Sequence, residues 1–403
     1  MRPLVIVSDV HLGHRRCADV ADDLARLVAG HSEHEIILNG DTFNLSCDPW
    51  SLDPAVSAPA MIAAHPELRT ALESHLAAGG HLTFVAGNHD MALQRPGVRV
   101  ALASLLGRGA SCQSDAGPGA SGADGRLSIE PWILRRGAIH IEHGHLYDPG
   151  NSPTHPLAEP SPRAEPVGME LTRRFVGPYD LWEVLADRWT NSAAQNLGVM
   201  YDKLGWGVVT SSLYYCGLLG LVNLETAVPA RLNRDRRAGE AALPAFAAQV
   251  GLPEAALRGL VAGRHEPMHF SFAATFMRFG FDALAAIAAI PGGIAAAILS
   301  RHPMWLLLSA AGLGYLVAAR DRLAHRGANH MPEDLREGAA LVHHLTDARL
   351  VILGHTHRED EMEGYLNLGA FGDRPAAGAR TYVHVDEAGN AARCTLPATA
   401  SIS

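Results

Sequence analysis

The stretch VIVSDVHLGH, residues 5–14, constrains the fold most, because an apolar run ends abruptly in an acidic and an imidazole side chain. Residues two apart in a strand point to the same face, so Asp9 and His11 converge beyond a strand predicted over Leu4–Ser8. Ligands of α/β sheets bind beyond the carboxyl ends of strands, and this oxygen–nitrogen pair suits a divalent transition metal. Taken alone, the pair fits a metal site no better than it fits a strand end capped by Asp9 with His11 on the surface.

Four further stretches also place polar side chains directly after an apolar run. They are IILNGDTFNL, LTFVAGNHD, IHIEHGHLYDP and LVILGHTHR, which carry Asp41, Asn88, His89, His143, His145, His355 and His357. Five unrelated turns rarely supply such a set of side chains. We therefore expect these residues to meet at one edge of a sheet.

This set of side chains matches the ligands of a site for two divalent metal ions. Two such ions about 3.5–4 Å apart clamp a phosphoryl group during in-line displacement. One bridging carboxylate, neutral imidazoles and an amide oxygen complete the two coordination shells. A water that two ions share loses its proton easily and becomes the nucleophile.

Strand and helix patterns alternate along the first third of the chain, which predicts an α/β layered domain. The expected strands are Leu4–Ser8, Glu35–Asn39, His81–Ala86, Ile129–Arg135, Ala138–Glu142, Leu350–Leu353, Tyr365–Leu368, Thr381–Val385 and Ala392–Leu396. The expected helices include Ala18–Ala29 and Pro66–Ala78. Residues 115–125 are predicted to form a flexible loop.

A helical block interrupts the sheet domain. Six prolines within residues 148–168 indicate an irregular exit from the sheet, and residues 169–345 read as mostly helical. We predict that residues 1–148 and 346–403 are two parts of one domain. Residues 149–345 then form a Pro-rich linker and an apolar helical insert.

Three stretches of this insert, residues 204–224, 283–300 and 302–319, lack charged side chains. The last two each have 18 residues, close to the lower limit of about 17 for a transmembrane helix, whereas Pro291 and its neighbouring glycines weaken a span. Arg320, Arg322 and Arg326 would suit the cytoplasmic side. We expect either membrane contact through residues 204–224 and 283–319 or a soluble cap of very apolar helices.

Composition narrows the class of partner and the compartment. A net charge of −9 argues against a broad nucleic-acid surface, so no nucleic-acid partner is expected. The five cysteines form no CxxC pair, which argues against a disulfide framework or a zinc knuckle. The first strand begins too early to leave room for a signal peptide. We expect a cytoplasmic protein, associated with the inner face of the membrane if its apolar stretches meet lipid.

In order and spacing, DVH, GDTFN, GNHD, HGH and GHTH resemble the calcineurin-like metallophosphoesterases, over about residues 1–148 and 348–398. The resemblance implies a four-layer αββα sandwich and a dinuclear metal-dependent phosphoester or pyrophosphate hydrolase. The implied ligands are Asp9, His11, Asp41 and His357 for one ion, and Asp41, Asn88, His143 and His355 for the other, with Asp41 bridging. Mn²⁺ is the expected metal, with Fe²⁺, Zn²⁺ or Co²⁺ as alternatives.

The same resemblance implies roles for residues near the metals. His89 would bind a phosphate oxygen or protonate the leaving group, and Asp90 would orient His89. Either His143 or His145 of HGH could be the ligand, and we prefer His143 because it lies closest to the apolar strand. Asn44 stands where many relatives have a carboxylate and is not expected to touch the metals.

We expect the insert to determine which substrate binds. It begins after HGHLYDPGN and ends before GHTH, so both of its ends lie next to candidate ligands and it can cover the metals. SDVHLG, HGHLYDP and YLNLG resemble the branch that hydrolyses the pyrophosphate of UDP-2,3-diacylglucosamine in lipid A synthesis, which uses Mn²⁺ and has a helical cap. This implies a lipid-linked or nucleotide-linked substrate at a membrane surface. Arg358 and Asn367 are the expected substrate contacts, and Arg173 and Arg174 are either phosphate contacts or solvated surface arginines.

Other substrates remain open on the same metal site. A nuclease or a cyclic-nucleotide phosphodiesterase would use these ligands with an open or basic groove, and a protein phosphatase would need a solvent-open cleft. A scaffold without activity on this fold would be expected to lose ligands or His89, and none is missing here.

Overall fold

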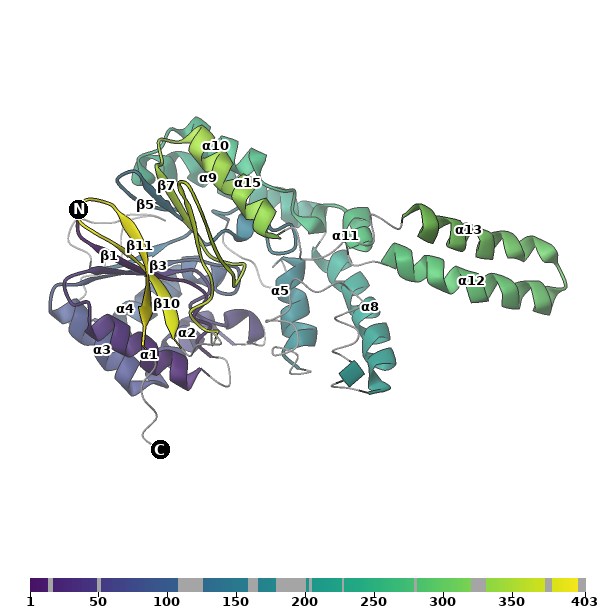
Figure 1. Ribbon diagram of the computed structural model, residues 1–403, viewed down its shortest axis with the longest axis horizontal. Helices are drawn as coiled ribbons and strands as arrows, with labels where there is room; N and C mark the ends of the chain where they lie inside the picture. Colours follow the sequence, from purple (N-terminus) through teal and green to yellow (C-terminus); the bar gives the residue numbers. More distant parts are fainter. Residues whose placement is uncertain are drawn as a thin grey trace. The chain divides into compact units, whose positions relative to one another are not determined.

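The computed structural model describes residues 1–13, 17–48, 52–107, 126–158, 166–178, 201–202, 205–226, 228–278, 281–319, 331–373 and 379–397. The chain divides into two compact units, which we call the sheet unit and the helical unit (Figure 1). The sheet unit comprises Met1–Arg173, Val228–Pro267 and Pro332–Ser403, and the helical unit comprises Arg174–Ala227 and Met268–Met331. The predicted loop 115–125 lies outside the described residues.

The first sheet of the sheet unit has the strand order β11-β10-β1-β2-β3-β4. Its strands are β1 (Leu4–Val7), β2 (Glu35–Asn39), β3 (His81–Val85), β4 (Leu127–Glu130), β10 (Arg380–Val385) and β11 (Ala391–Leu396). Strands β1 to β4 are parallel, whereas β10 pairs antiparallel with β1. The carboxyl ends of β1, β2 and β3 therefore lie along one edge of this sheet.

The second sheet has the order β5-β6-β7-β9-β8. Its strands are β5 (Leu134–Arg136), β6 (Ile139–Ile141), β7 (Leu350–Leu353), β8 (Glu359–Met362) and β9 (Tyr365–Leu368). Strands β6, β7 and β9 are parallel, and β5 and β8 close the two edges in the antiparallel sense.

Alternate residues of β1 face different layers, as the period of a strand requires. Leu4 and Ile6 join the core between the two sheets, which Ile139 and Ile352 enter from the opposite side. Val5 and Val7 join the core beneath the helices on the outer face of the first sheet. These helices are α1 (Ala18–Ala29), α2 (Pro54–Ala63), α3 (Pro66–Ala77) and α4 (Pro96–Leu106).

Helices α9 (Pro229–Val250), α10 (Glu254–Gly263) and α15 (Met331–Leu345) accompany the second sheet (Figure 1). Phe246 of α9 stacks on Trp132 at a ring-centroid distance of 6.0 Å, and Nε2 of His343 in α15 lies 3.0 Å from the carbonyl of Gly364. The result is a mixed α/β architecture consistent with the expected sandwich. The segment predicted as an insert, residues 149–345, contributes to both units.

Two features of the sheets differ from the sequence-based expectation. The single strand expected over Ile129–Arg135 is wrong, because β4 and β5 belong to different sheets. Pro131 lies where the chain leaves β4, and proline has no backbone N–H to continue a ladder. Strand β8 was not predicted, because its sequence EDEM is polar and its side chains are largely exposed at a sheet edge.

The described part of the helical unit contains α8 (Gly207–Thr226), α11 (Phe272–Arg278), α12 (Phe281–Ser300), a 3₁₀ turn η7 (Pro303–Trp305) and α13 (Leu306–Ala318). At the end of the first segment of the sheet unit, α5 (Val167–Leu171) leads into a π-helical turn over Thr172–Val176, within which the helical unit begins. None of the helices in the described residues has both the length and the hydrophobicity needed to cross a bilayer.

Candidate metal centre

The five sequence motifs follow the carboxyl ends of parallel strands in the sheet unit. Asp9 and His11 follow β1, Asp41 follows β2, Asn88 and His89 follow β3, His143 and His145 follow β6, and His355 and His357 follow β7. Three overlapping groups of these side chains bring their ligating atoms within 4.8 Å of one another, so that each group could hold a metal ion. The groups are Asp9, His11 and His357; His11, Asp41 and His89; and Asp41, His143 and His355.

The loops that carry the candidate ligands have an unusual backbone. The φ angles of Asp9, His11, Asp41, His355 and His357 are 54°, 55°, 50°, 73° and 56°. This left-handed region costs a residue with a side chain roughly 1–2 kcal/mol, and such strain gathers where function demands it. Backbone hydrogen bonds, such as that from the N–H of His11 to the carbonyl of Asp41 at 2.9 Å, hold these turns in place.

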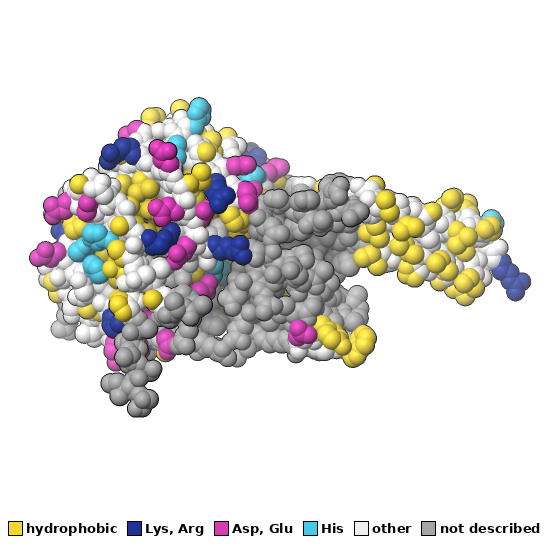
Figure 2. Space-filling view, viewed as in Figure 1, with side chains coloured by type: hydrophobic (Ala, Val, Ile, Leu, Met, Phe, Trp, Pro, Cys, Tyr) yellow, Lys and Arg dark blue, Asp and Glu magenta, His cyan; other side chains and the backbone are white. Residues whose placement is uncertain are grey.

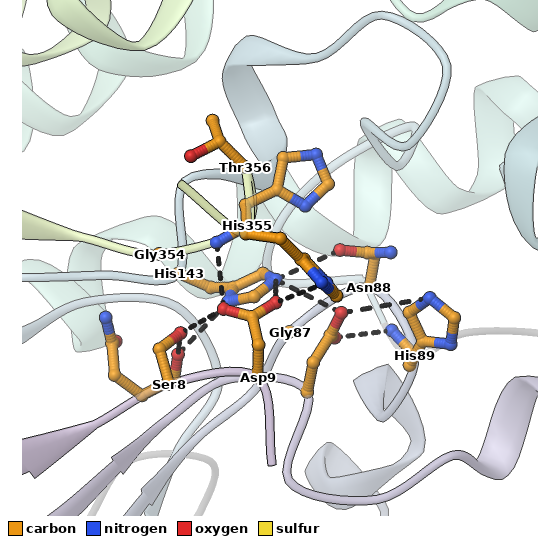
Figure 3. Close-up of polar contacts among 12 residues, drawn as sticks. Ser8, Asp9, Gly87, Asn88, His89, His143, Gly354, His355 and Thr356 are labelled. Atoms are coloured by element: carbon orange, nitrogen blue, oxygen red, sulfur yellow. Dashed lines mark hydrogen bonds and ion pairs between the residues drawn. The ribbon is translucent and has the colours of Figure 1, made fainter. Parts of the chain in front are cut away.

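Asp9 lies fully buried at the centre of the cluster (Figure 3). Its Oδ2 accepts hydrogen bonds from the hydroxyl of Ser8 at 2.6 Å and the backbone N–H of His355 at 3.1 Å. Its Oδ1 has no hydrogen-bond partner among the described residues, and lies 3.4 Å from Nε2 of His357 and 3.9 Å from Nε2 of His11. A buried carboxylate oxygen facing two imidazole nitrogens is the arrangement that a cation would complete.

His11 and His357 bring their Nε2 atoms within 3.2 Å of each other. Nδ1 of His357 lies 3.0 Å from Oδ2 of Asp373, so it can donate its proton there and keep the lone pair of Nε2 directed at Asp9. Sequence reasoning did not find Asp373, because no motif surrounds it. Its 16-residue separation from His357 in the chain gives no signal of the contact.

The second group is built around His143, whose ring is fixed by a backbone carbonyl. Nδ1 of His143 donates to the carbonyl of Asn39 at 3.0 Å, so Nε2 is the atom that would bind a metal ion after losing its proton. That atom lies 3.1 Å from Oδ1 of Asn88 and 3.3 Å from Oδ2 of Asp41. Because His145 belongs to none of the three groups, the geometry favours His143 over His145 as the ligand.

His355 completes this second group and has an acidic partner of its own. Its Nε2 lies 3.1 Å from Oδ2 of Asp148. A proton on Nε2 that is donated to Asp148 leaves Nδ1 as the atom available to a metal ion. Asp148 is a second residue that the motif analysis did not select, although it follows HGHLY directly.

Residues 2–193 match the family model of the calcineurin-like phosphoesterases. The match covers slightly less than half of the chain, and over these residues the chain is similar to a calcineurin-like phosphoesterase domain. Such a domain indicates a metal-dependent phosphoester hydrolase. No curated protein matches the chain. The family match includes the candidate ligands from Asp9 to His143 and ends before His355 and His357, which the second sheet brings to the same site.

Ser46 rather than Asp90 contacts the ring of His89. Nδ1 of His89 lies 2.5 Å from the hydroxyl of Ser46, and its backbone N–H donates to Oδ1 of Asp41 at 2.8 Å. The Asp90 carboxylate instead accepts backbone N–H groups at 2.7 Å from both Gly87 and Thr42. The expected orienting contact from Asp90 is thus corrected: Asp90 ties the GNHD loop to the loop that carries Asp41.

The charges of the site favour bound cations. Burial opposes ionisation of Asp9 and Asp41, yet His143 and other nearby imidazoles hold the pKa of both carboxyls below its usual range. Burial would lower the pKa of His143, but Asp41 and Asp9 raise it to about 9. Burial lowers the pKa of His89 to about 3, so this ring is neutral near pH 7. Two buried carboxylates with imidazole and amide neighbours form a donor set that fits divalent transition metals.

The two expected substrate contacts differ in their surroundings. Arg358 is exposed directly after His357, and its backbone N–H contacts the hydroxyl of Thr356. Asn367 is fully buried, with Nδ2 donating to the carbonyl of Gly354 at 2.8 Å and Oδ1 accepting the N–H of Gly369. The expectation that Asn367 contacts substrate is therefore corrected to a role in holding the loop that leads to His355.

Proposed function

We propose that this protein hydrolyses a phosphoester or pyrophosphate bond with the help of two divalent metal ions. One ion would be held by Asp9, His11, Asp41 and His357, and the other by Asp41, Asn88, His143 and His355. The observation that carries the proposal is the approach of ligating atoms within 4.8 Å in three groups that overlap through His11 and Asp41. When bound, the two ions supply charge neutralisation of the phosphoryl group and a water of lowered pKa.

The protein's own side chains prepare this site. Asp41, the proposed bridging ligand, has Oδ2 facing His143 and Oδ1 held by the backbone N–H of His89. The carbonyl of Asn39 and the carboxylate of Asp373 fix the ring orientations of His143 and His357. Rigid rings keep the ligand atoms in place without rearrangement during the reaction.

His89 is the proposed contact to the phosphoryl group. If the hydroxyl of Ser46 donates to Nδ1, the neutral ring carries its own hydrogen on Nε2. That N–H can donate a hydrogen bond to a phosphate oxygen or to the oxygen of the leaving group, and so offset the negative charge that develops there as the ester bond breaks. Exposed Arg358, next to His357, is the proposed second contact to the substrate.

The identity of the metal and the class of substrate are also proposals. We propose Mn²⁺ as the metal, and a lipid-linked or nucleotide-linked substrate processed in the cytoplasm at the inner face of a membrane. The motifs SDVHLG, HGHLYDP and YLNLG support this substrate class through their resemblance to the UDP-2,3-diacylglucosamine diphosphatase branch. Exposed apolar side chains of α12 and α13 are compatible with a lipid surface.

The test is Mn²⁺-dependent hydrolysis of UDP-2,3-diacylglucosamine beside the generic diester bis-p-nitrophenyl phosphate, with Asp41→Ala as the control. Turnover of the lipid nucleotide well above that of the generic diester supports the lipid-linked assignment. Turnover of the generic diester alone keeps the metal-dependent reaction and rejects the lipid-linked substrate. If Asp41→Ala retains both activities, the metal-based mechanism is rejected.

A further inference from the structure

Helices α12 and α13 pack against each other as an antiparallel pair, which we call the apolar hairpin (residues 281–319). Small residues form the seam between them. Gly312 of α13 lies against the backbone of Ala286, and Gly293 of α12 lies against Ser309. The hydroxyl of Ser309 donates to the carbonyl of Ile290 at 2.7 Å. Close approach through small residues and a hydroxyl bond between helices is typical of helix pairs in lipid.

Most of the large apolar side chains described in the hairpin are exposed instead of buried in the seam (Figure 2). Leu299 is 84% exposed and Leu307 is 69% exposed. Leu306, Leu307 and Leu308 are consecutive and all exposed, so at about 100° per residue they cover different sides of α13. The further exposed residues are Ile287, Ile294, Ile298, Met304, Leu313 and Val317. This arrangement is the reverse of a water-soluble helix pair, which buries its large residues.

The few charges of the hairpin lie at its ends. Arg301 is the only Asp, Glu, Lys or Arg in residues 283–319, and it lies in the turn beside His302 and Trp305. At the other end, Asp282 accepts a hydrogen bond from the hydroxyl of Tyr315. A cation and a tryptophan beside an otherwise uncharged surface complement anionic phospholipid headgroups and the interface below them.

The distribution of exposed residues distinguishes lipid from other occupants. A partner helix or a second copy of the chain would cover one further stripe of α13, whereas acyl chains surround every exposed side. The length of α13, 13 residues or roughly 20 Å, is short of the roughly 30 Å hydrocarbon core. We propose that the apolar hairpin inserts into the surface of a membrane containing anionic phospholipids without crossing it. This attachment is independent of the reaction at the metal centre.

Flotation of the full-length protein with vesicles of phosphatidylcholine and phosphatidylglycerol tests the proposal. The variant Leu299→Glu/Leu307→Glu changes exposed residues of the hairpin and is expected to lower the vesicle partition coefficient at least about tenfold. The matched control Val56→Glu/Val100→Glu alters side chains of the sheet unit that are 67% and 56% exposed. The control is expected to float with the vesicles as the wild type does.

A second variant tests the electrostatic part. Arg301→Gln is expected to weaken binding to the anionic vesicles about fivefold and to leave binding to pure phosphatidylcholine vesicles unchanged. Wild-type protein that stays with neither type of vesicle overturns the proposal. So does a wild-type dimer that Leu299→Glu/Leu307→Glu converts to a monomer without any vesicle binding, since the surface is then an interface between copies. Hydrolysis of bis-p-nitrophenyl phosphate, measured on every variant, separates a failure of attachment from a failure of the proposed reaction.

Discussion

Three imidazoles of the metal centre have one nitrogen engaged by a protein oxygen, which leaves the other nitrogen for the site. The carbonyl of Asn39 engages His143, Asp148 engages His355, and Asp373 engages His357. Partners of this kind set the tautomer and the orientation of a ligand ring, and their loss typically weakens metal binding by about 10–100-fold.

Replacement of Asp373 tests whether its contact with His357 strengthens metal binding. We expect Asp373→Asn to lower Mn²⁺ affinity about 10–100-fold, because the ring of His357 loses a charged partner. Isothermal titration with Mn²⁺ measures the change. Asp347→Asn, which changes an exposed carboxylate paired with Arg135, is the matched control. Equal affinity of the Asp373 variant and the wild type would show that His357 needs no such partner.

Replacement of Ser46 separates orientation of His89 from metal binding. Ser46→Ala is expected to lower kcat about tenfold or more, because Nε2 of His89 is no longer directed at the site, while Mn²⁺ affinity stays unchanged. Ser46→Thr retains a hydroxyl and should restore part of the rate. A parallel fall of metal affinity and kcat in Ser46→Ala would instead assign His89 to the metals.

Sequence reasoning at the residue scale selected the groups at the ends of strands and missed those that support them. Asp9, His11 and Asp41 are visible because an apolar run ends in them. Asp373 and Ser46 reach the site through tertiary contacts that no local pattern encodes. The substrate contact expected of Asn367 came from the resemblance of YLNLG to a family branch, and such a resemblance does not reveal that backbone groups satisfy both ends of its amide.

At the scale of the elements, the loop after β3 and the loop after β2 approach each other closely at Gly87. A Cβ atom at this position would overlap both Oδ1 and the backbone nitrogen of Asp41. We expect Gly87→Ala to destabilise the fold by about 1–3 kcal/mol and to abolish most activity, since the backbone of Asp41 would have to move. Urea unfolding and diester hydrolysis measure the two effects.

The control for this change is Gly97→Ala in α4. A Cβ there meets only Ala55, at an ordinary 3.6 Å. Alanine is favoured over glycine in a helix by about 0.5–1 kcal/mol, so this variant should be neutral or slightly stabilised. Similar destabilisation of both glycine variants would contradict the role given to the close approach at Gly87.

His155 gives the fold a pH dependence away from the metal centre. Burial, followed by the charge of Arg264, lowers the pKa of His155 from 6.5 to about 4. The unfolded chain therefore binds a proton at a higher pH than the folded chain. Stability is full above about pH 6.5 and falls as pH drops toward 4, by up to about 3 kcal/mol from this residue. Urea unfolding at pH 7.5 and 5 measures the loss, and His155→Gln should reduce it. An unchanged loss in the variant would assign the pH dependence to other groups.

The sequence predicts a strand well where both faces of that strand are buried. Mainly apolar runs predict β1, β2, β3 and β7, because parallel strands buried on both faces are rich in apolar residues. The polar edge strand β8 has no such signal, and the break between β4 and β5 depends on which sheet each strand joins.

At the scale of the whole molecule, the parallel strands of the two sheets end at the same candidate metal centre. The carboxyl ends of β1, β2 and β3 in the first sheet and of β6 and β7 in the second supply ligands separated by almost the entire chain. The order of motifs predicts this convergence. The return of residues 228–267 to the sheet unit is not predictable in the same way, since it depends on packing partners such as Phe246 and Trp132.

The central claim is that these strand ends together bind two divalent ions that the phosphoesterase needs. The most direct measurement is the Mn²⁺ content of the protein after equilibrium dialysis, with hydrolysis of bis-p-nitrophenyl phosphate on the same samples. The wild type should bind two ions per chain, and Asp41→Ala should lose at least one ion and nearly all activity, because Asp41 belongs to two of the three groups and is the proposed bridge between the ions. An Asp41→Ala variant that retains two ions and full activity in metal-replete buffer would contradict the account.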